Sequence, residues 1–225
     1  MRRLRHRRNE RGSAVVEAAI VLPTIIMVLF GMLEMGLYFK DTLTLSEATK
    51  DGARTGAQWA QDPGADYYIL QAIKKASLSG NILEVIVYDA APADPTNQSA
   101  QAPSAACQSS SNGVSVTYTD SGGISHPTGA IGSCNVYVAA NGDFNHPLAD
   151  FLGTGQTFTN AGHWPGAQRL QNTTDTRYTT SGQTYPGPDQ IGVWVKTTHY
   201  WATGFIATTP TSITDQSVFR IEPRQ

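Results

Sequence analysis

The sequence has few of the residues from which catalytic and metal sites are built. Its 225 residues include two cysteines and five histidines, and no HExxH, HxH or CxxC spacing groups them as metal ligands. GxSxG, Walker and GxGxxG patterns are also missing. The nearest approach to a calcium loop, residues 141–145, is followed by Pro147 and Leu152 where oxygen ligands would be needed. We therefore expect no catalytic residues, no metal, no cofactor and no small-molecule substrate.

Charged residues are also scarce, at 15% of the chain, and they are unevenly distributed. Residues 1–12 contain six arginines and one glutamate, a net charge of +5, whereas the rest of the chain carries −7. A basic segment directly before an apolar run is typical of the cytoplasmic end of a membrane helix. We therefore expect the N-terminus in the cytoplasm and the distal part outside. Because the arginines abut a membrane segment, a nucleic-acid-binding arm is disfavoured and no nucleic-acid partner is expected.

One apolar run, residues 14–39, is long enough to cross a membrane. Its uncharged part, residues 18–33, would form about 24 Å of helix, and an extension to Phe39 gives about 33 Å. Since a bilayer core is about 30 Å thick, Glu34 must lie near the outer interface or have a partner. A secretory signal is disfavoured because the run exceeds the usual length of about 7–15 residues and no A-x-A site follows.

The helix is predicted to continue beyond the membrane, because residues 38–60 contain neither proline nor a turn cluster. Residues 62–64, Asp-Pro-Gly, supply the stop, which gives a helix of about 47 residues and roughly 70 Å. Small residues recur in it at a spacing of four: Ala48, Gly52, Gly56 and Ala60. This stripe predicts close packing of the helix on the chain's own domain. Contact with a neighbouring subunit is the more specific alternative.

The distal part has the patterns of an α+β domain. We expect a short second helix, an antiparallel sheet of four or five strands, and long surface loops over residues 90–112 and 141–188, the latter with a helical turn at 148–152. The helix is predicted at residues 65–79 and the strands at 82–88, 114–119, 134–139, 190–202 and 216–222. In the fourth strand, Ile191, Val193 and Val195 alternate with Trp194 and Lys196, which indicates a half-buried strand.

Both cysteines, Cys107 and Cys134, lie in the part predicted to be exported. Oxidising compartments permit disulfides, so we expect these two residues to be bonded. Closing a loop of about 28 residues would stabilise the fold by roughly 3–4 kcal/mol.

Glu17 stands at the start of the membrane helix, where a carboxylate is costly unless it is paired. If the peptide bond between Gly12 and Ser13 were cut, the new amine of Ser13 would lie one helical turn from Glu17. The amine of an adjacent helix would be a second partner for the carboxylate. Alternatively, Glu17 is solvated among lipid headgroups, and spacing alone leaves the two interpretations even.

The N-terminal residues resemble a known family. Glu-Arg-Gly-Ser-Ala-Val-Val-Glu at 10–17, followed by Ala-Ala-Ile-Val-Leu-Pro at 18–23, is similar to the start of the TadE-like proteins, minor pilins (pseudopilins) of bacterial Tad/Flp pili. Further similar stretches lie at residues 31–36 and 48–54, with weaker likeness at 192–200 and 217–222. In the middle of the chain, about residues 62–188, we identify no such resemblance.

The resemblance implies a non-enzymatic subunit of pilus assembly. Gly12 would be the last residue of a leader that a prepilin peptidase removes, and Ser13 the mature N-terminus. Glu17 would be the mature residue that pairs with a subunit N-terminus during assembly. The implied partners are that peptidase, other pilin and minor pilin subunits, and the Tad inner-membrane assembly platform. Ala18 stands where the major pilins have an aromatic residue, which favours a minor pilin.

We therefore expect three parts: a basic cytoplasmic leader (1–12), a long transmembrane, pilin-like helix (13–61) and an exported α+β domain (62–225). The expected location is the bacterial inner membrane, crossed once with the N-terminus inside, and then the pilus. The competing hypothesis is a static single-pass anchor that displays an extracytoplasmic ligand-binding domain, with Trp164, Trp194, Trp201 and the tyrosines as a stacking platform. A third hypothesis, a membrane-anchored hydrolase, is weaker because the sequence shows no catalytic spacing.

Overall fold

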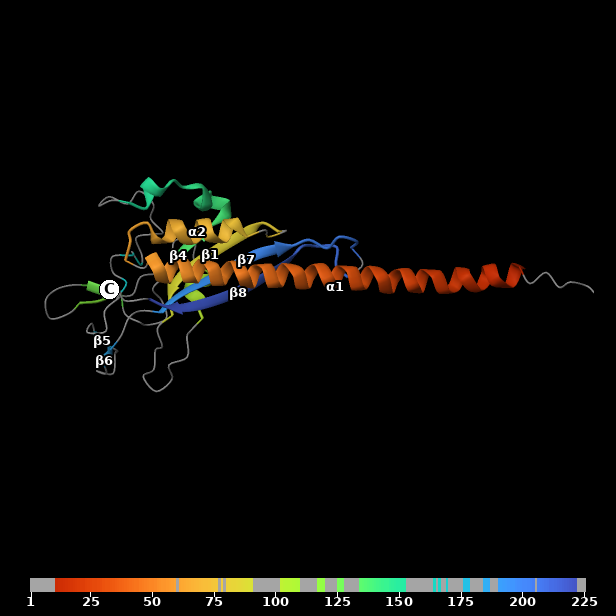
Figure 1. Cartoon of the computed structure of the whole chain (residues 1–225), viewed down its shortest axis with the longest axis horizontal. Coiled ribbons are helices and arrows are strands. Elements are labelled where there is room, and N and C mark those ends of the chain that lie inside the picture. Colours follow the sequence, from red (N-terminus) through yellow and green to blue (C-terminus); the bar gives the residue numbers. More distant parts are fainter. Residues whose placement is uncertain are drawn as a thin grey trace, which may run out of the picture. The chain divides into compact units, whose positions relative to one another are not determined.

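The structure is a computed structural model (Figure 1). It describes residues 11–59, 61–76, 78, 80–90, 102–109, 117–119, 125–127, 134–152, 164, 166, 169, 176–178, 184–186, 190–204 and 206–221. The chain divides into two compact units. The first consists of Met1–Lys40 and Tyr200–Pro210, and the second of Asp41–His199 and Thr211–Gln225.

The first element is the predicted long helix, α1, which runs over Arg11–Trp59 and contains Pro23. It ends at the predicted stop signal. The amide of Asp62 donates to the carbonyl of Trp59 at 2.6 Å, and the Asp62 carboxylate accepts from the amide of Gly64 at 2.7 Å. The second predicted helix, α2, is shorter than expected and covers Ala65–Lys75.

The sheet has four strands in the order β4-β1-β7-β8, all antiparallel, which confirms the predicted α+β class (Figure 1). These strands are β1 (Ile82–Asp89), β4 (Cys134–Val138), β7 (Gln190–His199) and β8 (Thr211–Arg220). The last two differ from prediction at their ends. β7 stops at His199, and β8 begins at Thr211, five residues before the predicted start. The two strands pair along their whole length as one hairpin, so pairing sets these bounds.

The remaining elements are short. The strand predicted at 114–119 is described only over β2 (Thr117–Thr119), which pairs with β3 (Ser125–Pro127) outside the main sheet. A second hairpin, β5 (Thr176–Tyr178) with β6 (Thr184–Pro186), was not predicted. The other elements are α3 (Ala105–Ser109), η1 (Ala139–Asn141), η2 (Asp143–Asn145) and η3 (Leu148–Asp150), the last being the predicted helical turn. Much of residues 90–112 and 153–188, predicted as loops, lies outside the described residues.

One face of the sheet packs against α2 and the C-terminal half of α1. The buried positions of α1 follow a helical stripe: Asp41, Leu45, Ala48, Thr49, Gly52, Ala53, Gly56 and Ala57. A Cβ at Gly56 would lie 2.7 Å from Cδ1 of Ile191 and 3.0 Å from Cδ1 of Ile69. A Cβ at Gly52 would lie 2.9 Å from Cγ1 of Ile73. The described part of the small-residue stripe therefore packs on the chain's own domain, as predicted.

The opposite face of the sheet carries a second core, which corrects the prediction of a half-buried β7. Ile86, Tyr88, Val136 and Trp194 form it together with both cysteines. Because this cluster covers the face that was expected to be exposed, Trp194 is buried as well as Val193 and Val195. The ring of Tyr88 lies over its cross-strand partner Gly192, where an added Cβ would be 2.2 Å from Cζ. Burial raises the pKa of Tyr88 above its usual range.

The predicted disulfide is present. Cys107, on the short helix α3, is bonded to Cys134 at the start of β4, with a Cα–Cα distance of 6.2 Å. Both residues are fully buried in the second core. The bond therefore fixes α3 to the end of the edge strand.

Candidate functional site: the N-terminal helix and its contacts

The N-terminal part of α1, residues 14–30, is exposed in its own unit. Every residue from 14 to 30 is exposed, although nearly all are apolar. The helix is long and apolar enough to cross a membrane, and it is the one such helix among the described residues. Exposed apolar surface of this extent belongs in lipid or against other apolar helices. The structure thus suggests a single-pass membrane protein.

The predicted processing and assembly residues lie at the beginning of this helix. The backbone is already helical at Gly12 and Ser13, and Glu17 follows one turn later. Residues four apart lie on the same side of a helix, so residue 13 and Glu17 share a face. The Glu17 side chain is exposed. The carboxylate is therefore accessible to a partner that approaches this face.

Glu34, the other carboxylate of the apolar run, is in a different situation, since only 1% of its surface is exposed. Both the backbone amide and the hydroxyl of Thr203 donate hydrogen bonds to its Oε1 atom. One turn further along α1, the ring of Tyr38 is stacked on Trp201, with centroids 6.0 Å apart and planes within 2°. The sequence predicted that Glu34 would need a partner. Thr203, 169 residues away, was not foreseen.

A second set of polar contacts lies within the second unit and joins the later part of α1 to the sheet. Oδ2 of Asp41 lies 2.6 Å from Nδ1 of His199, at the end of β7, and both side chains are buried. Two turns later the hydroxyl of Thr49 donates to Oδ2 of Asp215 on β8 at 2.6 Å. These hydrogen bonds fix the position of the helix along the β7–β8 hairpin.

Asp66 of α2 is the centre of a buried polar cluster that sequence reasoning missed. Its carboxylate accepts from Arg169 at 2.5 Å, and from Asn135 and Tyr137 of β4 at 2.6 Å each. Burial, followed by the neighbouring carboxylate, raises the pKa of Tyr137 well above its usual range, so the phenol stays protonated and donates. The Arg169 guanidinium also lies 4.5 Å above the ring of Trp164. The cluster is fully internal and has a structural role.

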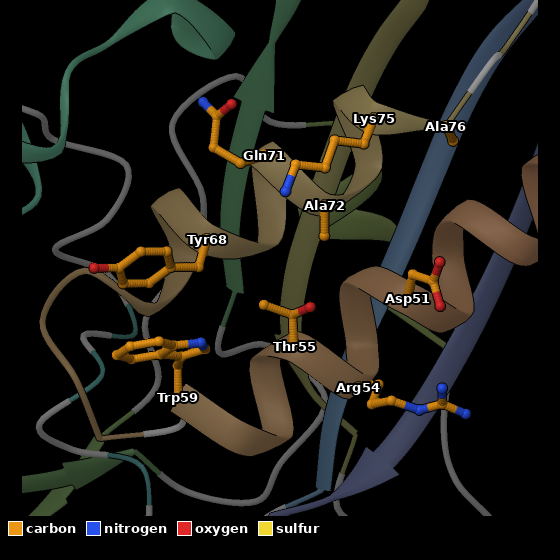
Figure 2. Close-up of a pocket in the computed structure, with 9 residues that line it drawn as sticks. All are labelled: Asp51, Arg54, Thr55, Trp59, Tyr68, Gln71, Ala72, Lys75 and Ala76. Atoms are coloured by element: carbon orange, nitrogen blue, oxygen red, sulfur yellow. The ribbon is translucent and has the colours of Figure 1, made fainter.

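A groove of about 430 Å³ separates the end of α1 from α2 (Figure 2). Trp59 and Tyr68 stack at one end with their centroids 4.2 Å apart, while Arg54 and Asp51 project from α1 at the other end (Figure 2). It is lined by Asp51, Arg54, Thr55, Trp59, Tyr68, Gln71, Ala72, Lys75 and Ala76. It contains no histidine, cysteine or serine. The side chains of this groove are better suited to binding a polar partner than to catalysing a reaction.

The tryptophans do not form the platform that a ligand-binding surface would need. Trp164 is fully buried and Trp194 is 9% exposed, so neither offers a ring face to solvent. Trp201 is stacked on Tyr38. The prediction that these tryptophans form a stacking platform is therefore wrong, because their rings fill cores and intramolecular contacts. Within the described part of the chain, no group of three or more His, Cys, Asp or Glu residues is placed to hold a metal ion.

Comparison with known proteins adds one finding. The family model described as TadE-like protein matches residues 12–54, which confirms the resemblance drawn from the N-terminal motif. The matched segment begins at Gly12 and includes Glu17, Glu34 and the first half of the small-residue stripe, Ala48 and Gly52. No curated protein and no solved structure matches the chain. The TadE-like match suggests a protein that is associated with Tad pili. The TadE-like family is not a family of enzymes.

Proposed function

We propose that this chain is a minor pilin (pseudopilin) that takes part in assembly of a Tad/Flp type IV pilus. The observation that carries the proposal is the TadE-like match over residues 12–54 of an apolar helix whose surface is uncovered from residue 14 to residue 30. A helix of this kind is stable in a bilayer and equally stable in a bundle of apolar helices. Transfer between these two environments is what subunit assembly requires.

The basic leader, residues 1–12, is removed by a prepilin peptidase after Gly12, which leaves Ser13 as the mature N-terminus. The family match begins at Gly12, at this junction. Removing the leader takes away the +5 charge that would otherwise hold the N-terminus on the cytoplasmic side. The mature helix then begins with one cationic amine followed by an uncharged turn.

Glu17 pairs with the N-terminal amine of a neighbouring subunit. Its exposure leaves the carboxylate accessible from the helix surface. In an apolar environment an unpaired carboxylate costs several kcal/mol, whereas a carboxylate beside an ammonium group is largely compensated. The pair would therefore set the axial register between two helices that otherwise present only apolar side chains. The partners are other pilin and minor pilin subunits and the inner-membrane assembly platform.

The protein resides in the bacterial inner membrane, with residues 1–12 in the cytoplasm and the sheet domain outside. The charge segregation supports this orientation, and the Cys107–Cys134 disulfide agrees with an oxidising compartment for the domain. The domain, residues 62–225, stays folded while the helix leaves the bilayer, because it is linked to the second half of α1 by its own core.

The test of processing is a pair of leader variants expressed with the prepilin peptidase. Gly12→Asp places a charged side chain next to the scissile bond and should leave an uncleaved, membrane-retained precursor. Asn9→Asp adds the same charge three residues earlier and should be cleaved normally. Electrophoretic mobility and intact mass distinguish precursor from product. Normal cleavage of the Gly12→Asp variant would refute the assigned site.

A second candidate function is a static anchor that displays a ligand-binding domain. The groove between α1 and α2, with its stacked Trp59 and Tyr68, is the observation that favours it. An anchor of this kind would retain its arginine leader in the mature protein. The fate of the leader therefore separates the two candidates.

A further inference from the structure

The first unit contains a short segment, residues 200–210, that connects β7 to β8 and lies against α1. Thr203 of this segment binds Glu34, and Trp201 stacks on Tyr38. None of its eleven residues is charged. The segment nevertheless exposes apolar and aromatic side chains, with Tyr200 52% and Ile206 47% exposed. We call residues 200–210 the juxtamembrane loop.

The juxtamembrane loop contacts α1 at the level where the helix leaves the bilayer. A core of about 30 Å requires about 20 helical residues at 1.5 Å each. A span that begins at Ala14 therefore ends near Leu33, and one that begins at Ala18 ends near Leu37. Both choices place the partners of the loop, Glu34 and Tyr38, within about one and a half turns of the outer edge of the hydrocarbon.

The side chains of α1 around this level are those expected in lipid. Met35, Leu37 and Phe39 are exposed, and the first charged residue after Glu34 is Lys40. The loop therefore contacts α1, at Glu34 and Tyr38, in a stretch of the helix whose neighbouring apolar residues are exposed. Its composition also fits, because tyrosine and tryptophan are enriched where a membrane protein passes the headgroup region.

We propose that the juxtamembrane loop is embedded in the headgroup and upper acyl region of the leaflet on the side of the sheet domain. In this position it makes a second membrane contact, in addition to the span, and shields the Glu34 carboxylate from lipid. Thr203 supplies two donors, its backbone amide and its hydroxyl, to the Oε1 atom of that carboxylate. Ile206 and Tyr200 enter the interface. This inference does not depend on pilus assembly or on processing.

The experiment uses the full chain reconstituted in phosphatidylcholine–phosphatidylglycerol vesicles. Ile206→Cys is labelled with an environment-sensitive fluorophore without reduction, so that the Cys107–Cys134 disulfide does not react. Quenching is measured with iodide in the water and with lipids that carry a nitroxide near the headgroup end of the acyl chain. Met27→Cys, in the middle of the exposed span, is the membrane reference, and Thr214→Cys, exposed on β8, is the aqueous reference.

We expect the Ile206 label to be quenched several-fold more by the lipid nitroxide than the Thr214 label, and several-fold less by iodide. Thr208→Cys, a second exposed position in the loop, should behave in the same way if the first variant folds poorly. Equal iodide quenching at Ile206 and Thr214 would overturn the proposal. Protection from iodide without lipid quenching would also overturn it, because the loop would then be covered by protein.

Discussion

The two halves of α1 belong to one continuous helix, yet they are built for different surroundings. From residue 14 to residue 30 every side chain is exposed, and most are large and apolar. From Asp41 to Ala57 the inward positions are buried and mostly small, so that α2 and the sheet approach the helix backbone closely. The first half has the surface of a membrane helix, and the second half has the surface of a domain core.

The carboxylates of α1 follow the same division. Glu17, in the first half, is exposed, whereas Asp41, in the second half, is buried beside His199. Glu34 lies between them and is covered by Thr203. A buried carboxylate with an internal partner stabilises the fold, while an exposed one at the start of an apolar helix is accessible to an external partner. The comparison predicts that changes in the first half alter assembly and changes in the second half alter stability.

The largest expected effect is in the first half, at Glu17. Glu17→Ala should be processed at Gly12 and should unfold at the wild-type temperature, because the side chain is exposed. Pilus assembly should nevertheless be lost, since the carboxylate that pairs with the neighbouring amine is gone. Piliation is scored by electron microscopy of cells, with Glu17→Asp as the matched variant that retains the charge. Unchanged piliation in the alanine variant would remove the pairing role.

The next effect is in the second half, at Gly56. A leucine there would be forced against Ile191 and Ile69, so Gly56→Leu should destabilise the domain by about 1–3 kcal/mol. At about 2–4 °C per kcal/mol, the unfolding midpoint in detergent should fall by about 2–12 °C.

Gly36→Leu is the control for this substitution, because nothing lies within 4 Å of a Cβ at Gly36. Its unfolding midpoint should equal that of the wild type. Equal losses for the Gly36 and Gly56 variants would contradict the division of the helix into an uncovered half and a packed half.

A smaller effect is expected at Thr203, whose partner Glu34 lies on α1 between the exposed part and the buried part of the helix. Thr203→Val removes the hydroxyl donor to Glu34 but keeps the backbone donor. A hydrogen bond to a charged group contributes about 1.5–3 kcal/mol, so amide exchange in residues 200–210 should accelerate by about tenfold or more. Thr208→Val, at an exposed position of the same loop, should leave exchange unchanged. Identical exchange in both variants would mean that the loop is held by other contacts.

The smallest effect concerns Glu84 of β1, whose pKa is raised by partial burial and lowered to a lesser extent by Lys196. A raised pKa means that the folded state favours the protonated acid. The wild type therefore loses stability as the pH rises through the ordinary value of 4.5 to the folded-state value. The Glu84→Gln variant has no carboxyl group to ionise and does not lose stability in this way. The difference between its unfolding temperature and that of the wild type should therefore shift in favour of the variant between about pH 4 and about pH 7. A constant difference across that range would show that Glu84 is fully solvated.

Local patterns in the sequence predicted the elements well. The apolar run, the absence of proline before Asp62 and the spacing of the small residues gave the long helix and the face that it buries. The β-rich segments gave four strands of the sheet, and the predicted export of the distal part gave the disulfide. Each of these features depends on residues that are close in sequence or on a property of the compartment.

Contacts between distant segments could not be predicted. The Asp66 cluster joins residues 66, 135, 137 and 169, and nothing in their local surroundings marks them as partners. The burial of both faces of β7 depends on α3 and the disulfide, which no alternation within β7 reveals. For Glu34 the sequence indicated the need for a partner but gave no means of choosing Thr203. The one indication in the sequence of a segment near the membrane was the absence of charged residues from 200–210.

The central claim is that the exposed start of α1 is produced by cleavage and used in assembly. The most direct test is the intact mass and N-terminal sequence of the protein purified from native membranes, with and without the prepilin peptidase. The account predicts a chain that begins at Ser13 in the first case and at Met1 in the second. A chain that keeps its arginine leader in both cases would contradict the claim, and the groove between α1 and α2 would then become the surface to probe for ligands.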